Sequence, residues 1–276
     1  MSYGNCNLTV CKFGGTSLAD EKTFEKVRNI VKADSRRRVI VVSAPGKRFA
    51  SDRKVTDVLY SLAKFGERTD EGYFNRCFGR FFLLAEKLGV CVDIKKKVGD
   101  IWRNTFLGED YIVSRGEYLC ALIMAEYLGF RFFDAADVFF FDESGAIDEG
   151  KTRSAVSSLD TSRGVVVPGF YGSDNNGNIK LFSRGGSDVS GAILAAYSGA
   201  ETYENWTDVS GVYNADPNKV FGQKPIEKIS YEALAAIADG GARVIHKGAI
   251  APLKKAGVKL KILNTFRPTD KGTLVE

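Results

Sequence analysis

The sequence predicts an α/β protein, a three-layer αβα sandwich around a mostly parallel central sheet. Short β-rich runs alternate with helical stretches along the chain, which is the pattern of βαβ units. Residues 39–43 (VIVVS) form a continuous apolar run, typical of a strand that helices cover on both faces. With 276 residues, the chain is long enough for one large α/β domain with a sizeable core.

The expected strands are short, and turn residues follow several of them. The first strand, over residues 8–13, runs directly into a glycine pair. Residues 169–182 are typical of a hairpin with the turn DNNG at 174–177, which predicts an antiparallel insertion. The expected strands are residues 8–13, 39–43, 131–133, 138–141, 165–168, 179–182, 202–206 and 259–263.

Helices are expected where apolar residues recur every three or four positions. Phe24, Val27, Ile30 and Val31 show this spacing soon after the first strand. No repeat or low-complexity linker interrupts the pattern, and the polar residues 142–162 are the most loop-like region, between two lobes of one domain. The expected helices are residues 20–31, 55–64, 71–88, 115–128, 188–197, 231–238 and 244–255.

Charge excludes some classes of partner. Lys and Arg number 39 against 34 Asp and Glu, which gives a formal net charge of +5. The densest basic runs, Arg36-Arg37-Arg38 and residues 95–97, are short, so we interpret them as solvated faces and expect no nucleic-acid partner. No apolar run approaches the ~18–20 residues of a membrane span, so no membrane partner is expected either.

Histidine and cysteine exclude several kinds of site. His246 is the single histidine, and the five cysteines form no C-x-x-C pair, so a zinc site of paired Cys and His ligands is unsupported. Catalysis by a Ser-His-Asp or Cys-His arrangement would have to use His246. The odd cysteine count, with cysteines in apolar stretches, indicates reduced and buried thiols. We therefore expect a cytoplasmic protein.

Residues 145–152 (GAIDEGKT) match the Walker A pattern of P-loop NTPases. The match has a weakness, because Asp148 and Glu149 within it would repel a phosphate. No apolar run ending in aspartate follows as a magnesium-binding Walker B segment. We interpret the segment as a polar surface loop, and a P-loop NTPase that uses Lys151 is the alternative.

Three other turns at expected strand ends carry charged residues beside glycine or turn residues. Residues 12–17 (KFGGTS) combine a lysine with a glycine pair, which lets the backbone approach a phosphate closely. Residues 183–188 (SRGGSD) open an expected helix, where Arg184 suits carboxylate or phosphate recognition and Asp188 suits the orientation of a lysine or a metal. Residues 206–217 again follow a strand. Together they favour a ligand site at the carboxyl ends of the strands.

Eight short motifs follow one another along residues 8–274. They are KFGGTS (12–17), VSAPGK with VTDVL (42–47 and 55–59), SRGE (114–117), PGFYGSD (168–174), SRGGSD (183–188), TDVSGVYNADP (207–217), GARVIH (241–246) and NTF with GT (264–266 and 272–273). In this order they resemble the motifs of the aspartokinases, in the amino-acid kinase family. KFGGTS together with RGGSD favours the aspartokinases over relatives that phosphorylate glutamate, acetylglutamate, carbamate or UMP.

The resemblance implies the amino-acid kinase fold and the reaction of ATP with L-aspartate to give 4-phospho-L-aspartate and ADP. This reaction is the first step of lysine, threonine and methionine biosynthesis, and Mg²⁺ would enter bound to the nucleotide. The resemblance also implies a single catalytic domain, with an amino-acid-binding lobe over about residues 1–165 and an ATP-binding lobe over about 166–276. Family members commonly form homodimers, so a homodimer is a further expectation.

The roles of individual residues follow from the resemblance. Lys12 would bridge the transferring phosphate, Asp188 would organise this lysine, and Glu117 would pair with the substrate ammonium. A carboxylate nucleophile is already ionised at neutral pH (reference pKa ~3.9), so no general base is needed and His246 is interpreted as structural. The implied aspartate-binding residues are Ser43, Thr56, Glu117, Arg184 and Ser187. The implied nucleotide-binding residues are Lys12, Gly14, Gly15, Thr207, Asp208, Tyr213, Asn218, Arg243 and Val244.

Some features depart from the family pattern. Arg243 stands where the family usually has lysine, Asn218 where arginine is common, and Lys247 where proline is usual. Aspartokinases usually continue into regulatory ACT domains, which this sequence does not contain, so we expect no feedback inhibition by lysine or threonine. Two further alternatives are a catalytically silent subunit that binds aspartate or nucleotide, and a kinase of another small carboxylate.

Overall fold

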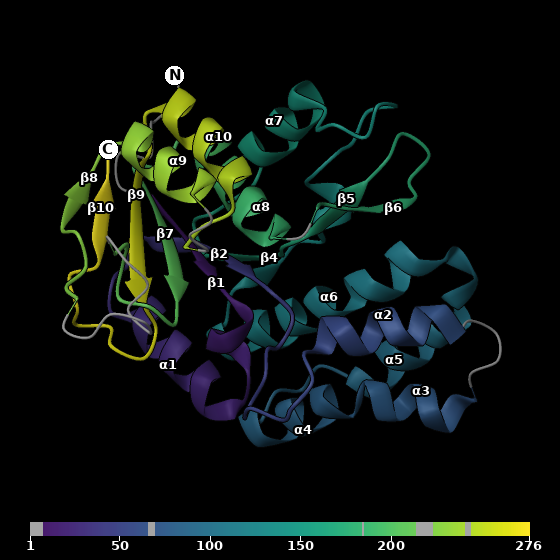
Figure 1. Cartoon of the computed structure of the whole chain (residues 1–276). Coiled ribbons are helices and arrows are strands. Elements are labelled where there is room, and N and C mark those ends of the chain that lie inside the picture. Colours follow the sequence, from purple (N-terminus) through teal and green to yellow (C-terminus); the bar gives the residue numbers. More distant parts are fainter. Residues whose placement is uncertain (1–7, 66–69, 184, 214–222, 241–243) are drawn as a thin grey trace.

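The centre of the fold is an eight-stranded sheet with the strand order β3-β4-β2-β1-β7-β9-β10-β8 (Figure 1). The computed structural model describes residues 8–65, 70–183, 185–213, 223–240 and 244–276. Neighbouring strands are parallel, except that β9 and β10 are antiparallel. The strands are β1 (Thr9–Phe13), β2 (Arg37–Val42), β3 (Arg131–Phe132), β4 (Val165–Pro168), β7 (Thr202–Thr207), β8 (Lys228–Ile229), β9 (Lys259–Asn264) and β10 (Thr273–Val275).

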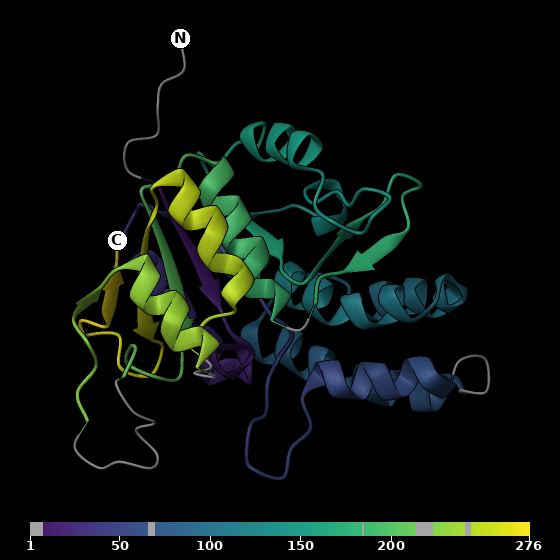
Figure 2. The same ribbon diagram turned by 45° about the horizontal axis from the view of Figure 1, so that its top comes forward.

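Helices pack on both faces of this sheet (Figures 1 and 2). Alternate side chains of β2 show the two faces, because Ile40 and Val42 lie in one buried cluster and Val39 and Val41 in the other. The predicted αβα sandwich is therefore confirmed. Within the described ranges, no helix is long and apolar enough to cross a membrane. The first cluster involves α1 (Glu21–Lys32), α2 (Val55–Phe65), α3 (Glu71–Cys77), α4 (Gly79–Leu88), α5 (Ile94–Arg103) and α6 (Glu109–Leu128), and the second involves α7 (Glu149–Ser157), α8 (Gly186–Tyr197), α9 (Tyr231–Asp239) and α10 (Ile250–Ala256).

The antiparallel insertion is confirmed as the hairpin of β5 (Tyr171–Ser173) and β6 (Ile179–Leu181). The expected strand at residues 138–141 is wrong. A 3₁₀ turn (Ala135–Asp137) precedes these residues, and Phe140 and Phe141 form isolated bridges with Ser173 in the hairpin and with Ile147. The apolar side chains that predicted a strand are buried in the second cluster instead, which explains the apolar run without a place in the main sheet.

Three expected helices have wrong bounds. The expected helix at residues 115–128 begins earlier, at Glu109. The expected helix at residues 71–88 is divided into α3 and α4 at Phe78, whose backbone leaves the helical conformation. The expected helix at residues 244–255 begins only at Ile250, after the 3₁₀ turn Lys247–Ala249.

The region expected to be most loop-like contains a helix. Within residues 142–162 the chain forms α7, whose N-cap Asp148 accepts a hydrogen bond from the backbone N–H of Lys151. Aspartate is a common N-cap residue, because its carboxylate accepts a hydrogen bond from the N–H three residues later. Asp148 of the Walker-like segment therefore caps a helix, and Glu149 lies in its first turn. Helix α5 and the short strands β8 and β10 were not predicted either.

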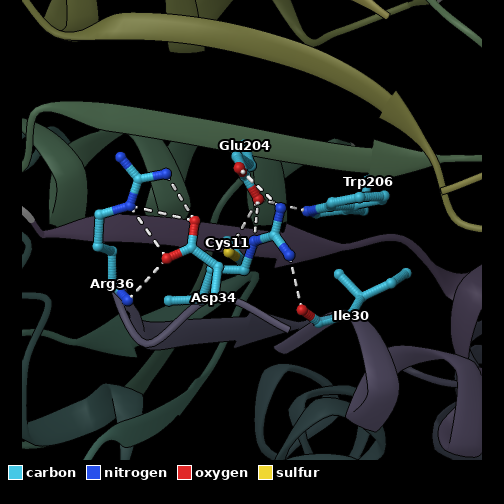
Figure 3. Close-up of polar contacts among 7 residues, drawn as sticks. Cys11, Ile30, Asp34, Arg36, Glu204 and Trp206 are labelled. Atoms are coloured by element: carbon cyan, nitrogen blue, oxygen red, sulfur yellow. Dashed lines mark hydrogen bonds and ion pairs between the residues drawn. The ribbon is translucent and has the colours of Figure 1, made fainter. Parts of the chain in front are cut away.

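One member of the basic run 36–38 is not a solvated residue. Arg37 forms an ion pair with Glu204 beneath the sheet, with 2.8 Å between Nε and Oε2, and Arg37 Nη1 donates to the carbonyl of Ile30. Figure 3 shows Glu204 accepting hydrogen bonds from Trp206 Nε1 and Cys11 Sγ as well. Burial raises the pKa of the Cys11 thiol, so the group stays protonated. This network joins β1, β2 and β7 on the face that α1 covers.

Candidate active site

A cavity of about 430 Å³ opens where the carboxyl ends of β1, β2, β4 and β7 meet. This is the edge at which sheets of this type bind ligands. It brings together residues from six of the eight motifs. The lining residues are Lys12, Gly14, Gly15, Thr16, Ser43, Ala44, Pro45, Gly46, Lys54, Thr56, Asp57, Tyr60, Glu117, Phe170, Gly185, Ser187, Asp188, Thr207 and Asp208.

Lys12 and Asp188 form an ion pair at the floor of this cavity. The distance from Lys12 Nζ to Asp188 Oδ1 is 2.7 Å, and the two side chains are only 11% and 13% exposed. Asp188 is held from two further directions: its Oδ2 accepts from the backbone N–H of His246 at 2.8 Å, and its Oδ1 from Asn205 Nδ2 at 3.3 Å. The aspartate is therefore fixed before a ligand enters, and it directs the ammonium of Lys12 into the cavity.

The glycine pair after β1 forms a tight loop under this ammonium. A Cβ atom on Gly14 would lie 3.5 Å from Lys12 Nζ, and one on Gly15 would lie 2.9 Å from the carbonyl of Ala44. The backbone N–H of Gly14 donates to the carbonyl of Trp206 at 3.1 Å, which ties the loop to the end of β7. Only glycine fits at position 15, and the bare backbone leaves room for a phosphate beside Lys12.

The start of α8 forms the opposite wall. Gly185 is its N-cap, with φ of +84°, and no side chain caps this helix start. A Cβ atom on Gly185 would lie 2.7 Å from the ring of His246. Ser187 and Asp188 in the first turn line the cavity. The N–H groups of Gly186 and Asp188 donate to the carbonyls of Ser183 and Gly185. The start of α8 therefore favours an anion mainly through its helix dipole.

Glu117 is buried in the wall of the cavity that α6 forms. It comes from the middle of α6 and is 3% exposed. Burial raises its pKa to about 8, and a backbone hydrogen bond from Ala44 opposes this rise only in part. Its Oε2 atom has no hydrogen-bond partner among the described residues. A buried carboxyl with a free oxygen facing a cavity suits a cationic group of a ligand.

The predicted nucleotide residues are divided between two places. Thr207 and Asp208 line the same cavity as Lys12. Tyr213 lines a second cavity of about 450 Å³, together with Lys224, Arg267 and other residues. Val244 packs against the second buried cluster and lines neither cavity. The predictions for Arg184, Asn218 and Arg243 lie outside the described residues.

Several lining residues were not predicted. Lys54 and Asp57 flank the predicted Thr56, and Tyr60 lies one helical turn further along α2, so helical spacing from Thr56 was the available signal. Phe170 has φ of +75°, the single positive φ of a non-glycine residue in the described ranges. A bulky residue in this conformation stores strain of about 1–3 kcal/mol and is found mainly at functional sites. The sequence alone does not predict a positive φ at Phe170.

His246 is not in a helix, contrary to the prediction. It is the N-cap of a 3₁₀ turn, and its Nδ1 accepts a hydrogen bond from the N–H of Gly248 at 3.2 Å. Its own N–H is used by Asp188, which explains why the helix begins later. The ring packs over Gly185 and lies outside the set of cavity-lining residues. His246 therefore has a structural role, as predicted, and the structure adds that its backbone N–H positions Asp188.

The Walker-like segment lies elsewhere. Lys151 is exposed on α7, and its Nζ donates to Asn175 Oδ1 at 2.7 Å. The hydroxyl of Thr152 is buried and accepts from the backbone N–H of Phe140. None of these residues lines the Lys12 cavity. The segment lies at the surface as predicted, although part of it is helical and not a loop.

The fold and the site define a class of protein. A lysine paired to an aspartate, a glycine pair after β1 and an uncapped helix start meet at the carboxyl ends of parallel strands, as in proteins that bind phosphate-bearing ligands. The particular family follows from its sequence model. The model of the amino acid kinase family matches residues 7–264, and the chain belongs to this family.

The chain is also similar to individual aspartokinases. It is 33% identical over 287 residues to aspartokinase 3 of Bacillus subtilis (strain 168), an alignment that covers 97% of this chain and 63% of that protein. The crystal structure of the Clostridium acetobutylicum aspartate kinase matches with a TM-score of 0.91 at 43% identity, over 97% of this chain and 63% of that one. E. coli aspartokinase III in complex with aspartate and ADP matches with a TM-score of 0.85 at 28% identity, over 97% and 64%. The chain therefore spans less than two thirds of the length of these relatives. The UMP kinase of Bacillus anthracis, at 16% identity and a TM-score of 0.54, shares the fold alone.

Proposed function

We propose that this chain is an aspartate kinase catalytic domain. It transfers the γ-phosphoryl group of ATP to the β-carboxylate of L-aspartate and releases 4-phospho-L-aspartate and ADP. The observation that carries the proposal is that one cavity holds both the Lys12–Asp188 pair and the buried Glu117. The first suits a transferring phosphate and the second suits the ammonium group of an amino acid. The similarity to E. coli aspartokinase III with aspartate and ADP supports the same substrates.

The reaction needs positioning and charge stabilisation more than proton transfer. The β-carboxylate of aspartate is ionised at neutral pH and attacks phosphorus directly, so no residue has to act as a general base. Negative charge spreads over the oxygens of the transferring group, and the fixed ammonium of Lys12 stabilises it there. The glycine turn at Gly14 and Gly15 leaves room for the phosphate on one side, and the positive end of the α8 dipole faces it on the other. Mg²⁺ bound to the ATP phosphates would neutralise further charge.

The two substrates approach from different sides of the sheet edge. Ser43, Thr56, Glu117 and Ser187 line the part of the cavity that we assign to aspartate. The nucleotide side follows from Thr207, Asp208 and the second cavity at Tyr213. A lobe of about residues 1–165 for the amino acid and one of about 166–276 for ATP stays a prediction, and Ser187 would reach the aspartate from the second of these lobes. The homodimer, the cytoplasmic location and the role in lysine, threonine and methionine biosynthesis stay predictions too.

The alternatives make different predictions. A silent subunit would bind ligands without turnover, yet the chain keeps the lysine, the aspartate and the carboxyl in one cavity, which binding alone does not require. For a P-loop NTPase, Lys151→Ala would abolish ATP binding. We expect Lys151→Ala to bind ATP like the wild type, because this side chain is exposed and outside the cavity.

A panel of acceptors tests the substrate. ADP release is measured with ATP, Mg²⁺ and one acceptor at a time: L-aspartate, D-aspartate, L-glutamate, succinate or carbamate. We expect turnover with L-aspartate, and at least about a hundredfold lower kcat/KM with succinate, which lacks the ammonium that Glu117 would bind. Equal turnover with succinate would contradict the role of Glu117. Turnover with a different acceptor alone would support the kinase of another small carboxylate.

A further inference from the structure

A loop over residues 45–54 connects β2 to α2 (Figure 2). It forms one wall of the cavity. Pro45, Gly46 and Lys54 in this loop line the cavity directly. The loop contains no helix or strand of its own, so its shape depends on contacts with other parts of the chain.

Gly46 packs against Gly15 and Thr16, in the glycine turn that follows β1. Its backbone N–H donates to the carbonyl of Gly15 at 2.7 Å. A Cβ atom on Gly46 would lie 2.6 Å from the carbonyl carbon of Gly15 and 2.8 Å from the backbone nitrogen of Thr16. The loop and Gly15 therefore touch backbone to backbone, and this contact sets the position of Gly46 against the end of β1.

The guanidinium of Arg80 holds both ends of this loop. Arg80 lies in the first turn of α4, a helix that contributes no residue to the cavity. Its Nη1 donates to the carbonyl of Gly46 and, at 3.4 Å, to that of Pro45, while its Nη2 donates to the carbonyl of Arg53 at 3.4 Å. Nη2 also pairs with the carboxylate of Asp52.

The contact is largely shielded from solvent and involves several hydrogen bonds. The side chains of Arg80 and Asp52 are each 10% exposed. Asp52 is bound from its other side by Arg48, with Nε to Oδ2 at 2.8 Å and Nη2 to Oδ1 at 3.0 Å. All hydrogen bonds of the Arg80 guanidinium in the described ranges go to the loop. A buried cation whose described partners all lie in one loop is stable only while that loop stays in place.

We propose that Arg80 is a positioning residue for the phosphoryl transfer. It clamps the loop of residues 45–54 against Gly15, so that the aspartate-side wall of the cavity is formed before the substrate binds. The planar guanidinium fork reaches Pro45, Gly46, Asp52 and Arg53 at once, which a lysine ammonium cannot do. The assignment of this wall to aspartate rests on the proposed function, whereas the clamping of the loop does not.

Limited proteolysis tests the clamp without any substrate. The loop carries four trypsin sites, Lys47, Arg48, Arg53 and Lys54. In Arg80→Ala we expect cleavage at these sites, followed by mass spectrometry, to be about tenfold faster than in the wild type. The matched control is Arg103→Ala, which removes an exposed arginine paired with Asp100 on α5 and should leave the loop sites unchanged. Equal loop cleavage in Arg80→Ala and the wild type would overturn the proposal.

Kinetics test the positioning of the substrate. We expect Arg80→Ala to raise the KM for aspartate about tenfold, with the KM for ATP changed by less than about threefold, since Thr207 and Asp208, which we assign to the nucleotide, lie at the end of β7 and not in this loop. Millimolar guanidinium should restore part of this loss in Arg80→Ala, and Arg80→Lys should be intermediate. Equal changes in both KM values, without rescue, would show a merely structural role and overturn the proposal.

Asp52→Asn provides a second variant if Arg80→Ala does not fold. It keeps Arg80 and its carbonyl contacts and removes only the negative charge, so it should show the same split between the two KM values at smaller size. Wild-type values for Asp52→Asn in both proteolysis and kinetics would contradict the clamp. If the wild type has no aspartate-dependent turnover, the proposed function fails, and the proteolysis result still decides on the clamp.

Discussion

Binding of aspartate should release a proton from Glu117. Burial raises the pKa of this carboxyl to about 8, so about nine in ten molecules carry the proton at pH 7 in the free enzyme. An ammonium group at contact distance favours the ionised carboxylate, so binding selects the ionised minority. The apparent dissociation constant for aspartate should therefore rise about tenfold for each pH unit below 8.

Calorimetry in pairs of buffers with different ionisation enthalpies measures this proton directly. At pH 7 we expect about 0.9 proton released per aspartate bound, falling to about 0.1 at pH 9. An affinity that is independent of pH between about 6 and 8, with no proton released, would refute the reasoning. It would mean that Glu117 is already ionised in the free enzyme or does not meet the ammonium group.

The same carboxyl affects stability without any ligand. Its pKa is higher in the folded chain than the ordinary value of 4.5, so the folded state binds more protons in this window and stability falls as the pH rises through it. A glutamine at this position cannot ionise, so Glu117→Gln should not lose stability as the pH rises. Its free energy of unfolding should exceed that of the wild type by up to about 3 kcal/mol at pH 7 and by almost nothing at pH 4. Urea unfolding at both values measures the difference, and a difference independent of pH would contradict the burial argument.

Two further substitutions test the scaffold of the site. Gly185→Ala should lower stability by about 1–3 kcal/mol and also lower activity, because the residue has φ of +84° and its Cβ would lie 2.7 Å from the ring of His246. Gly177→Ala, with φ of +80° and no atom within 4 Å of the Cβ position, isolates the backbone effect and should cost only about 1 kcal/mol in thermal denaturation. Glu204→Ala should cost about 3–5 kcal/mol, because it leaves the guanidinium of Arg37 buried without its partner. A double variant that also carries Arg37→Met should recover much of this loss, and a cost below about 1 kcal/mol for the single variant would contradict the buried pair.

The layered fold could be predicted because its signal is local and repeated. The run at residues 39–43 is apolar on both faces, and β2 indeed buries alternate residues in two different clusters. Strands β8 (Lys228–Ile229) and β10 (Thr273–Val275) were missed because two or three residues show no period. Their place at the sheet edge depends on pairing with distant segments, which a single sequence does not reveal.

The site could be predicted as a set of motifs but not as a geometry. Lys12 lies near the end of β1 and Asp188 in the first turn of α8, and the structure joins them at 2.7 Å. The role of His246 could not be predicted, since its backbone N–H and not its ring holds Asp188. Arg80 was missed for a similar reason. Its partners are mostly backbone carbonyls of a loop. Every residue has such a carbonyl, so the sequence does not indicate which of them bind a side chain.

The most direct test is the formation of acyl phosphate from ATP and aspartate, trapped with hydroxylamine as the hydroxamate. Wild type, Lys12→Ala and the control Lys32→Ala, which removes an exposed lysine of α1, are compared at saturating substrates. We predict aspartate-dependent product from the wild type and the control, and a loss of at least about a hundredfold in Lys12→Ala. Near-normal product from Lys12→Ala, or no aspartate-dependent product from a wild type that binds ATP, would contradict the central claim.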